Sequence, residues 1–99
     1  MPEPKTIYFK DESYSELLRE IPNPPERIFV LGNERALKEQ MNIAIVGTRK
    51  ASARGKEIAR KFAKSLSELN LTVVSGLAMG IDTAAHEGIV EARGKTIAV

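Results

Sequence analysis

Two short apolar runs constrain the fold of this chain most, because each ends where an amphipathic segment begins. Residues 42–47 read Asn-Ile-Ala-Ile-Val-Gly, and residues 71–75 read Leu-Thr-Val-Val-Ser. Uninterrupted apolar runs of this length are typical of strands that are covered on both faces, as in parallel sheets. We therefore predict two buried strands, each leading directly into a helix.

The segments after these runs have helical patterns. Residues 52–69 predict the clearest helix, and residues 82–92 predict a second one, with Asp82 as its N-cap and Gly94 near its C-terminal end. At 100° per residue, the apolar side of the first helix is expected to carry Ile58, Ala59, Phe62, Ala63, Leu66 and Leu69. Residues 95–99 begin a further strand.

This alternation of strands and helices predicts an α/β fold with a mostly parallel sheet and right-handed crossovers. The last predicted strand has no turn or covering helix after it. We therefore expect the chain to be the first part of a longer domain, incomplete at its C-terminus.

The first 40 residues have a different character. Three prolines within residues 22–25 exclude a helix there and predict an extended connector. A short helix is expected over residues 13–20 with Ser13 as its N-cap, a strand over residues 27–31, and another short helix over residues 34–40. We divide the chain into an N-terminal segment with its connector, 1–26, and the truncated main domain, 27–99.

Composition excludes several classes of function. The 99 residues contain no Cys and a single His, so disulfides, thiolate catalysis and Cys-ligated metal sites are excluded, and no metal site is expected. No apolar run approaches the length of a membrane span, and the N-terminus has no apolar signal region, so we expect a cytoplasmic protein that does not contact membranes. The net charge of +2 does not by itself indicate nucleic acid.

Two loops follow the predicted strands, over residues 46–55 and 75–82. Ligands of open α/β sheets bind at the carboxyl ends of the strands, where a helix N-terminus attracts anions. In the first loop, Arg49 stands where a dinucleotide fingerprint requires its second glycine, so a nicotinamide cofactor is disfavoured and no cofactor is expected. Arginine offers instead a bidentate donor to a phosphate oxygen. The second loop lacks the Gly-Lys-Ser/Thr of a phosphate-binding P-loop.

The candidate phosphate-binding or DNA-binding residues share a position in these two loops. They are Gly47, Thr48, Arg49, Ser52, Ser75, Gly76 and Gly80. Each has a structural alternative: the glycines can serve only the turns, Thr48 and Ser52 can cap a helix, and Arg49 can be a solvated surface residue. Similarly, His86 fits a hydrogen-bonded structural histidine better than a base, because no nucleophile is evident beside it. We identify no catalytic residue.

The order of the motifs resembles the DNA processing protein A family, also called Smf. Residues 21–25 resemble the family's proline segment, residues 29–33 resemble its first strand, and Gly47, Thr48 and Arg49 resemble its G-S/T-R signature. Residues 73–78 and 80–86 resemble the second signature, and residues 94–99 the strand after it. The resemblance covers residues 14–99 and rests on the order and spacing of these motifs.

The resemblance implies a Rossmann-like, three-layer domain that binds single-stranded DNA and is not an enzyme. Family members protect incoming DNA during natural transformation, help to load the RecA recombinase and form homodimers. Arg49 matches the arginine of the family's DNA pocket, with Gly47 and Thr48 as its loop partners, while Ser75, Gly76 and Gly80 are expected to shape the pocket floor. The dimer surface and the RecA contact would lie beyond residue 99.

Two alternatives remain open from the sequence. One is a nucleotide-binding or nucleotide-processing enzyme of the wider Rossmann-like superfamily, which needs a Pro-Gly-Gly-type loop and a downstream acid that residues 1–99 do not contain. The other is a fragment without function, whose open apolar sheet edge favours association.

Overall fold

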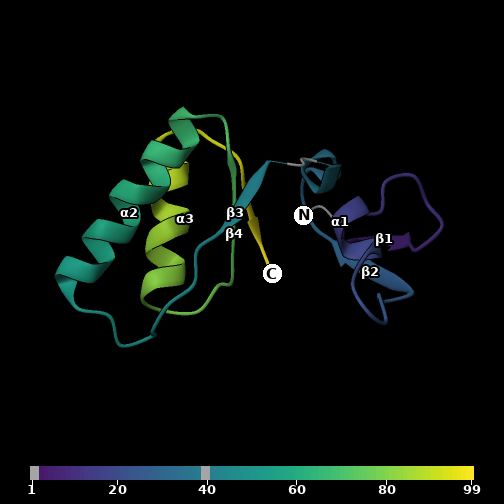
Figure 1. Cartoon of the computed structure of the whole chain (residues 1–99), viewed down its shortest axis with the longest axis horizontal. Helices are drawn as coiled ribbons and strands as arrows, with labels where there is room; N and C mark the ends of the chain where they lie inside the picture. The colour runs from purple at the N-terminus through teal and green to yellow at the C-terminus, as the bar shows by residue number, and fades with distance from the viewer. Residues whose placement is uncertain (1–2, 39–40) are drawn as a thin grey trace. The chain divides into compact units, whose positions relative to one another are not determined.

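The computed structural model describes residues 3–38 and 41–99, and the chain divides into two compact units, residues 1–40 and 41–99. Figure 1 shows the elements of each unit. The division falls after residue 40 rather than after residue 26, because the strand expected to open the main domain pairs within the N-terminal unit.

The N-terminal unit contains a two-stranded antiparallel sheet. Strand β1 (Lys5–Tyr8) pairs with β2 (Arg27–Val30), with Ile7 opposite Ile28. The helix α1 (Glu16–Arg19) and the 3-10 helix η1 (Glu34–Lys38) complete the unit. Strand β2 was predicted from the sequence, whereas β1 was not.

Tyr14 is the centre of the small N-terminal core. Its ring and the side chain of Ile7 have no exposed surface. The Tyr14 hydroxyl donates a hydrogen bond of 2.7 Å to the carbonyl oxygen of Pro25, which ties the proline connector to the core. The guanidinium of Arg19 lies 5.3 Å from the Tyr14 ring centroid, a cation–π contact. A single buried aromatic thus organises this unit.

Two local predictions for the N-terminal unit need correction. The helix after Tyr14 is capped by Ser15 and not by Ser13, because the Ser15 Oγ accepts a hydrogen bond from the Leu18 N–H at 3.3 Å. The helix expected over residues 34–40 is the 3-10 helix η1, and its last two expected residues, 39–40, lie outside the described residues. Residues 21–26 form bends without regular structure, as the prolines predicted.

The second unit has the predicted β-α-β-α-β order. Its strands are β3 (Asn42–Ala44), β4 (Thr72–Ser75) and β5 (Thr96–Ala98), joined by helices α2 (Ala53–Glu68) and α3 (Ile81–Glu91). The sheet order is β3-β4-β5, and both pairings are parallel. The α/β class, the Rossmann-like topology and the parallel sheet are confirmed.

Both helices of this unit cover the same face of the sheet (Figure 1). Right-handed crossovers that advance across a sheet in one direction place their helices on one face. The second helical layer of the expected three-layer arrangement is not among the described residues of this unit. Strand β3 lies at the edge of this sheet, and its Ile43 and Ala44, which point to opposite faces, are both exposed, although the sequence predicted a strand covered on both faces.

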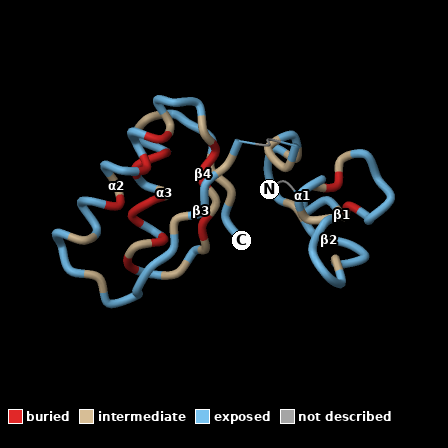
Figure 2. The backbone as a smooth tube through the Cα atoms, viewed as in Figure 1, coloured by how far each residue is buried: buried red, intermediate tan, exposed pale blue. Residues whose placement is uncertain are grey.

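The core of this unit lies between the helices and β4, as the buried segments in Figure 2 show. It consists of Ala63, Leu66, Val73, Ala85 and Ile89. The two helices approach closely because α3 carries a glycine at their contact: a Cβ on Gly88 would collide with the carbonyl oxygen of Arg60.

The apolar face of α2 is narrower than predicted. Ala59, Ala63 and Leu66 are buried, whereas Phe62 is 61% exposed, and Ile58 and Leu69 are exposed as well. At the close approach of α3 the helix packs through the small residues Ala59 and Ala63 together with Leu66, and its other large apolar residues stay exposed. Assigning Phe62 to the core was wrong in this structure.

Both long helices end in the Schellman pattern of hydrogen bonds. After α3, the Arg93 N–H donates to the Val90 carbonyl and the Gly94 N–H to the Ile89 carbonyl. Arg93 takes the left-handed conformation, with φ of 57°, and Asn70 does so after α2, with φ of 66°. Within the described residues, no helix combines the length and apolar character needed to cross a membrane.

Candidate functional site

The two predicted loops meet at the carboxyl edge of the parallel sheet. One follows β3 and leads into α2 at Ala53, and the other follows β4 and leads into α3 at Ile81. Because β3 and β4 are parallel neighbours, their ends lie at the same edge. The structure therefore brings the two groups of candidate residues together.

Glycines allow the two loops to pack backbone against backbone. Gly80 has a φ of 89°, and a Cβ there would collide with the carbonyl oxygen of Thr48 and lie 2.8 Å from that of Arg49. The Ile81 N–H donates to the Thr48 carbonyl at 3.2 Å. On the other loop, a Cβ at Gly47 would lie 2.7 Å from the Ile81 side chain. These contacts fix the backbone of residues 47–49 in place.

Asp82 connects the same two loops through its buried side chain. Its side chain is buried, and its Oδ1 accepts a hydrogen bond from the Gly47 N–H at 3.2 Å. Its Oδ2 would lie 2.7 Å from a Cβ at Gly76, so that position also has no room for a side chain. The prediction of Asp82 as N-cap was wrong, because α3 begins at Ile81 with Gly80 in the cap position. The carboxylate instead connects the start of α3 to the loop that follows β3, through its hydrogen bond with Gly47.

The hydroxyl-bearing candidates are engaged within the protein. The Ser75 hydroxyl is buried and donates to the Ile45 carbonyl at 2.5 Å, which ties β4 to β3. The Ser52 Oγ caps α2 by accepting from the Gly55 N–H at 3.0 Å, and the Thr48 Oγ1 accepts from the Lys50 N–H at 3.1 Å. Ser52 and Thr48 remain exposed, so their oxygens retain further hydrogen-bonding capacity.

Three cations surround this edge. Arg49, Lys50 and Arg54 are all exposed, and none forms an ion pair within residues 3–38 and 41–99. By contrast, Lys61 pairs with Glu57 at 3.1 Å on the same helix. Of these three cations, Arg49 was predicted as a site residue from the sequence, and Lys50 and Arg54 were not. The available signal was their position between the strand-ending glycine and the first turn of the helix.

The charge of the chain is divided unevenly between the units. Residues 1–40 contain six Lys or Arg and eight Asp or Glu, whereas residues 41–99 contain nine and five. The small overall charge therefore conceals a basic unit, and the three unpaired cations lie on it.

His86 has a structural role, as predicted. Its Nε2 lies 2.8 Å from the Gly76 carbonyl oxygen and its Nδ1 lies 2.7 Å from the Thr96 Oγ1. Because a carbonyl only accepts, Nε2 carries the proton of that bond. The ring thereby joins the end of β4 to β5. Among the described residues, no group of three or more His, Asp or Glu side chains is placed to hold a metal ion.

Comparisons with known proteins agree on one family. The model of the DNA recombination-mediator protein A family matches residues 5–99. DNA processing protein DprA from Streptococcus pneumoniae is 44% identical over 89 residues, which is 90% of this chain and 31% of that protein. DprA from Bacillus subtilis is 36% identical over 94 residues, covering 95% of this chain and 32% of that one.

Solved structures agree with the sequence matches. The crystal structure of DprA from S. pneumoniae has a TM-score of 0.86 and 40% identity, and the match covers 97% of this chain and 33% of that one. A structure of DNA processing protein A from Helicobacter pylori, described for its single-stranded DNA binding mode, has a TM-score of 0.73 and 26% identity over 94% of this chain and 40% of that one. The chain spans about a third of the length of these curated relatives. These matches do not favour a nucleotide-processing enzyme.

Proposed function

Because the chain belongs to the DNA recombination-mediator protein A family, we propose that it binds single-stranded DNA at the carboxyl edge of the β3-β4-β5 sheet. One observation carries the proposal: three exposed cations without ion pairs among the described residues, Arg49, Lys50 and Arg54, surround two loops whose backbones are fixed against each other. The H. pylori relative, described as binding single-stranded DNA, supports the choice of ligand.

In this proposal the residues bind phosphate and do not read sequence. The Arg49 guanidinium donates two parallel hydrogen bonds to a phosphate, while Lys50 and Arg54 neutralise neighbouring phosphates. The amides of Ala53 and Arg54 in the first turn of α2 lack intrahelical partners, whereas that of Gly55 is capped by Ser52, and the positive end of the helix dipole adds to the attraction. Gly47, Gly76 and Gly80 hold the loops in position, and Ser75 and Asp82 support them from within.

The biological role that we propose is the one expected for a member of this family. We propose that the protein protects incoming DNA in the cytoplasm during natural transformation and recombination, assists RecA loading and works as a homodimer. The proposal includes no catalytic step and no cofactor. The names of the relatives from S. pneumoniae and B. subtilis, both DNA processing proteins, and of the matching family, a recombination mediator, support the part of this role that concerns DNA and recombination.

A salt-dependent titration tests the assignment of Arg49. We expect Arg49→Ala to weaken binding of a fluorescein-labelled oligo(dT) about tenfold, since a charge-assisted hydrogen bond contributes roughly 1.5–3 kcal/mol. Removing one phosphate contact should also reduce the slope of log K against log salt by about 0.7. Fluorescence anisotropy at several salt concentrations measures both quantities.

The matched control is Arg35→Ala. Arg35 is also an exposed arginine without an ion pair among the described residues, but it lies in the N-terminal unit. Its replacement should leave affinity and slope unchanged. If the two variants bind equally well, Arg49 is not a phosphate contact.

A further inference from the structure

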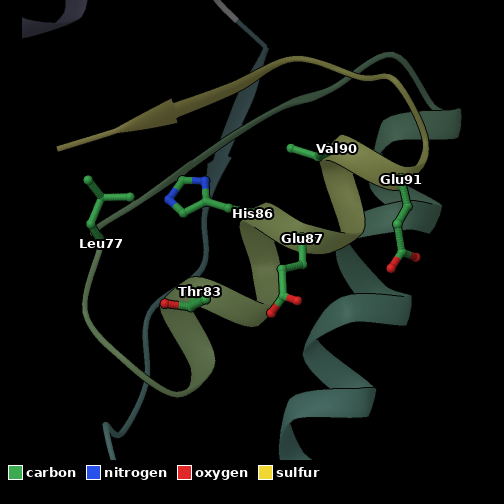
Figure 3. Close-up of a pocket in the computed structure, with 6 residues that line it drawn as sticks. All are labelled: Leu77, Thr83, His86, Glu87, Val90 and Glu91. Atoms are coloured by element: carbon green, nitrogen blue, oxygen red, sulfur yellow. The ribbon is translucent and has the colours of Figure 1, made fainter.

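We infer that a groove along α3 is a docking site for an arginine side chain carried by a segment of a partner protein. The groove has a volume of about 380 Å³ and lies on the outer side of α3, next to the loop that follows β4. Figure 3 shows the six residues that line it: Leu77, Thr83, His86, Glu87, Val90 and Glu91. The inference does not depend on the proposed DNA binding.

Two large apolar side chains form the walls of the groove. Leu77 is 75% exposed and Val90 is 67% exposed. Figure 3 shows them on either side of His86. Exposed apolar surface collected around a hollow, with polar residues at its rim, is typical of an interaction site.

The floor of the groove is rigid. The His86 ring is held at both nitrogens, by the Gly76 carbonyl and the Thr96 hydroxyl. The Thr83 Oγ1 donates to the Ala78 carbonyl at 2.7 Å, which fixes the loop that carries Leu77. A site held in this way loses little conformational entropy when a ligand binds.

Two carboxylates lie along the lower side of the groove. Glu87 and Glu91 are one helical turn apart, and Figure 3 shows both side chains on the same side of α3. Arg60 approaches them from α2, but at 3.7 Å and 4.0 Å, beyond ordinary hydrogen-bond length. Each carboxylate therefore keeps acceptor capacity for a second cation.

The negative charge of the groove favours a cationic ligand. Unit 41–99 has only five acidic residues, and two of them line this groove. A phosphate-bearing ligand would be repelled here. An arginine side chain fits both parts of the site: its methylene stem packs between Leu77 and Val90, and its guanidinium donates to Glu87 and Glu91. The partner is therefore a protein segment with an exposed arginine beside apolar residues.

Chemical-shift mapping on the full chain tests the inference. The probe is acetyl-Leu-Arg-Leu-amide, and the control probe replaces Arg by citrulline, which has the same shape without the charge. We expect the arginine peptide to cause saturable shifts of the Leu77, Thr83 and Val90 amides, and the citrulline peptide to bind at least fivefold more weakly. The double variant Glu87→Gln/Glu91→Gln should lose the same factor.

The matched variant is Glu57→Gln/Glu68→Gln, which removes two exposed carboxylates from α2 and should leave peptide affinity unchanged. Equal binding of both peptides, unchanged affinity of the Glu87/Glu91 variant, or shifts confined to other residues would each overturn the inference. Oligo(dT) titrated into the same variants separates the two proposals: Glu87→Gln/Glu91→Gln should not weaken DNA binding, whatever its effect on the peptide.

Discussion

At the scale of single residues, Gly80 combines a positive φ with a backbone contact between the two site loops that leaves no room for a side chain. We expect Gly80→Ala to lower the free energy of unfolding by at least about 2 kcal/mol, because it adds backbone strain at positive φ to a collision with the Thr48 carbonyl. Urea unfolding followed by circular dichroism measures the loss.

Gly55→Ala is the control for this substitution, because its Cβ would meet side-chain atoms alone, with the Ser52 Oγ nearest at 3.3 Å and the Ile81 side chain at 3.7 Å. It should change stability by less than about 1 kcal/mol, since alanine favours the helix there. Equal losses from the two substitutions would show that the contact between the loops is not tight.

Asp82 offers a second prediction at this scale. Asp82→Ala removes the buried carboxylate that accepts from the Gly47 N–H, and the loss of this hydrogen bond to a charged group should cost roughly 1–3 kcal/mol of stability. Hydrogen exchange should report the change locally, as faster exchange of the Gly47 amide. Unchanged protection of that amide would contradict the role assigned to the carboxylate.

Some residues of the site have a local sequence signal, and others depend on contacts between distant parts of the chain. The sequence indicated Arg49 and the glycines because a glycine after an apolar run followed by a helix is a local signal. It could not indicate that Asp82 bonds to Gly47, 35 residues away, because that bond depends on which strands are neighbours. The same holds for the hydroxyl of Ser75, which reaches the carbonyl of Ile45.

At the scale of elements, the ends of the long helices differ in their strain. Asn70 takes the left-handed conformation after α2, where Asn is common, but Arg93 takes it after α3 at a cost. We expect Arg93→Gly to raise the free energy of unfolding by roughly 0.5–1 kcal/mol. This gain is the backbone strain that the substitution removes, reduced by the conformational entropy that glycine adds to the unfolded chain.

Asn70→Gly should give a smaller gain in the same urea experiment, because less strain is present to remove. Ala92→Gly, at the neighbouring position with φ of −84°, should instead lower stability. A loss on Arg93→Gly would mean that the arginine side chain makes a stabilising contact that outweighs its backbone strain.

The elements predicted well were those with local patterns. The helices α2 and α3 and the strands β3, β4 and β5 follow from apolar periodicity and strand-ending glycines. Strand β1 was not predicted because its four residues alternate only weakly, and its pairing partner β2 lies beyond a proline connector. The exposure of Phe62 on α2 was missed because helical periodicity identifies an apolar sector but not how much of it a neighbouring helix covers.

At the scale of the whole molecule, the two units differ in charge, and this predicts where DNA binds. Unit 41–99 has four more basic than acidic residues, and unit 1–40 has two more acidic than basic ones. Phosphate attraction is therefore directed to the second unit. On adding oligo(dT) to the isotopically labelled full chain, we expect amide shifts at residues 47–55 and 76–80 and none in β1 or β2.

Raising the salt concentration should reduce all of these shifts together, because they report one electrostatic site. Lys50→Ala and Arg54→Ala should each flatten the salt slope further when combined with Arg49→Ala, by about 0.7 for every phosphate that is no longer neutralised. Shifts of equal size in the N-terminal strands would contradict this picture. They would mean that aromatic residues on the acidic unit, such as the exposed Phe29, stack with bases strongly enough to outweigh its repulsion of phosphate.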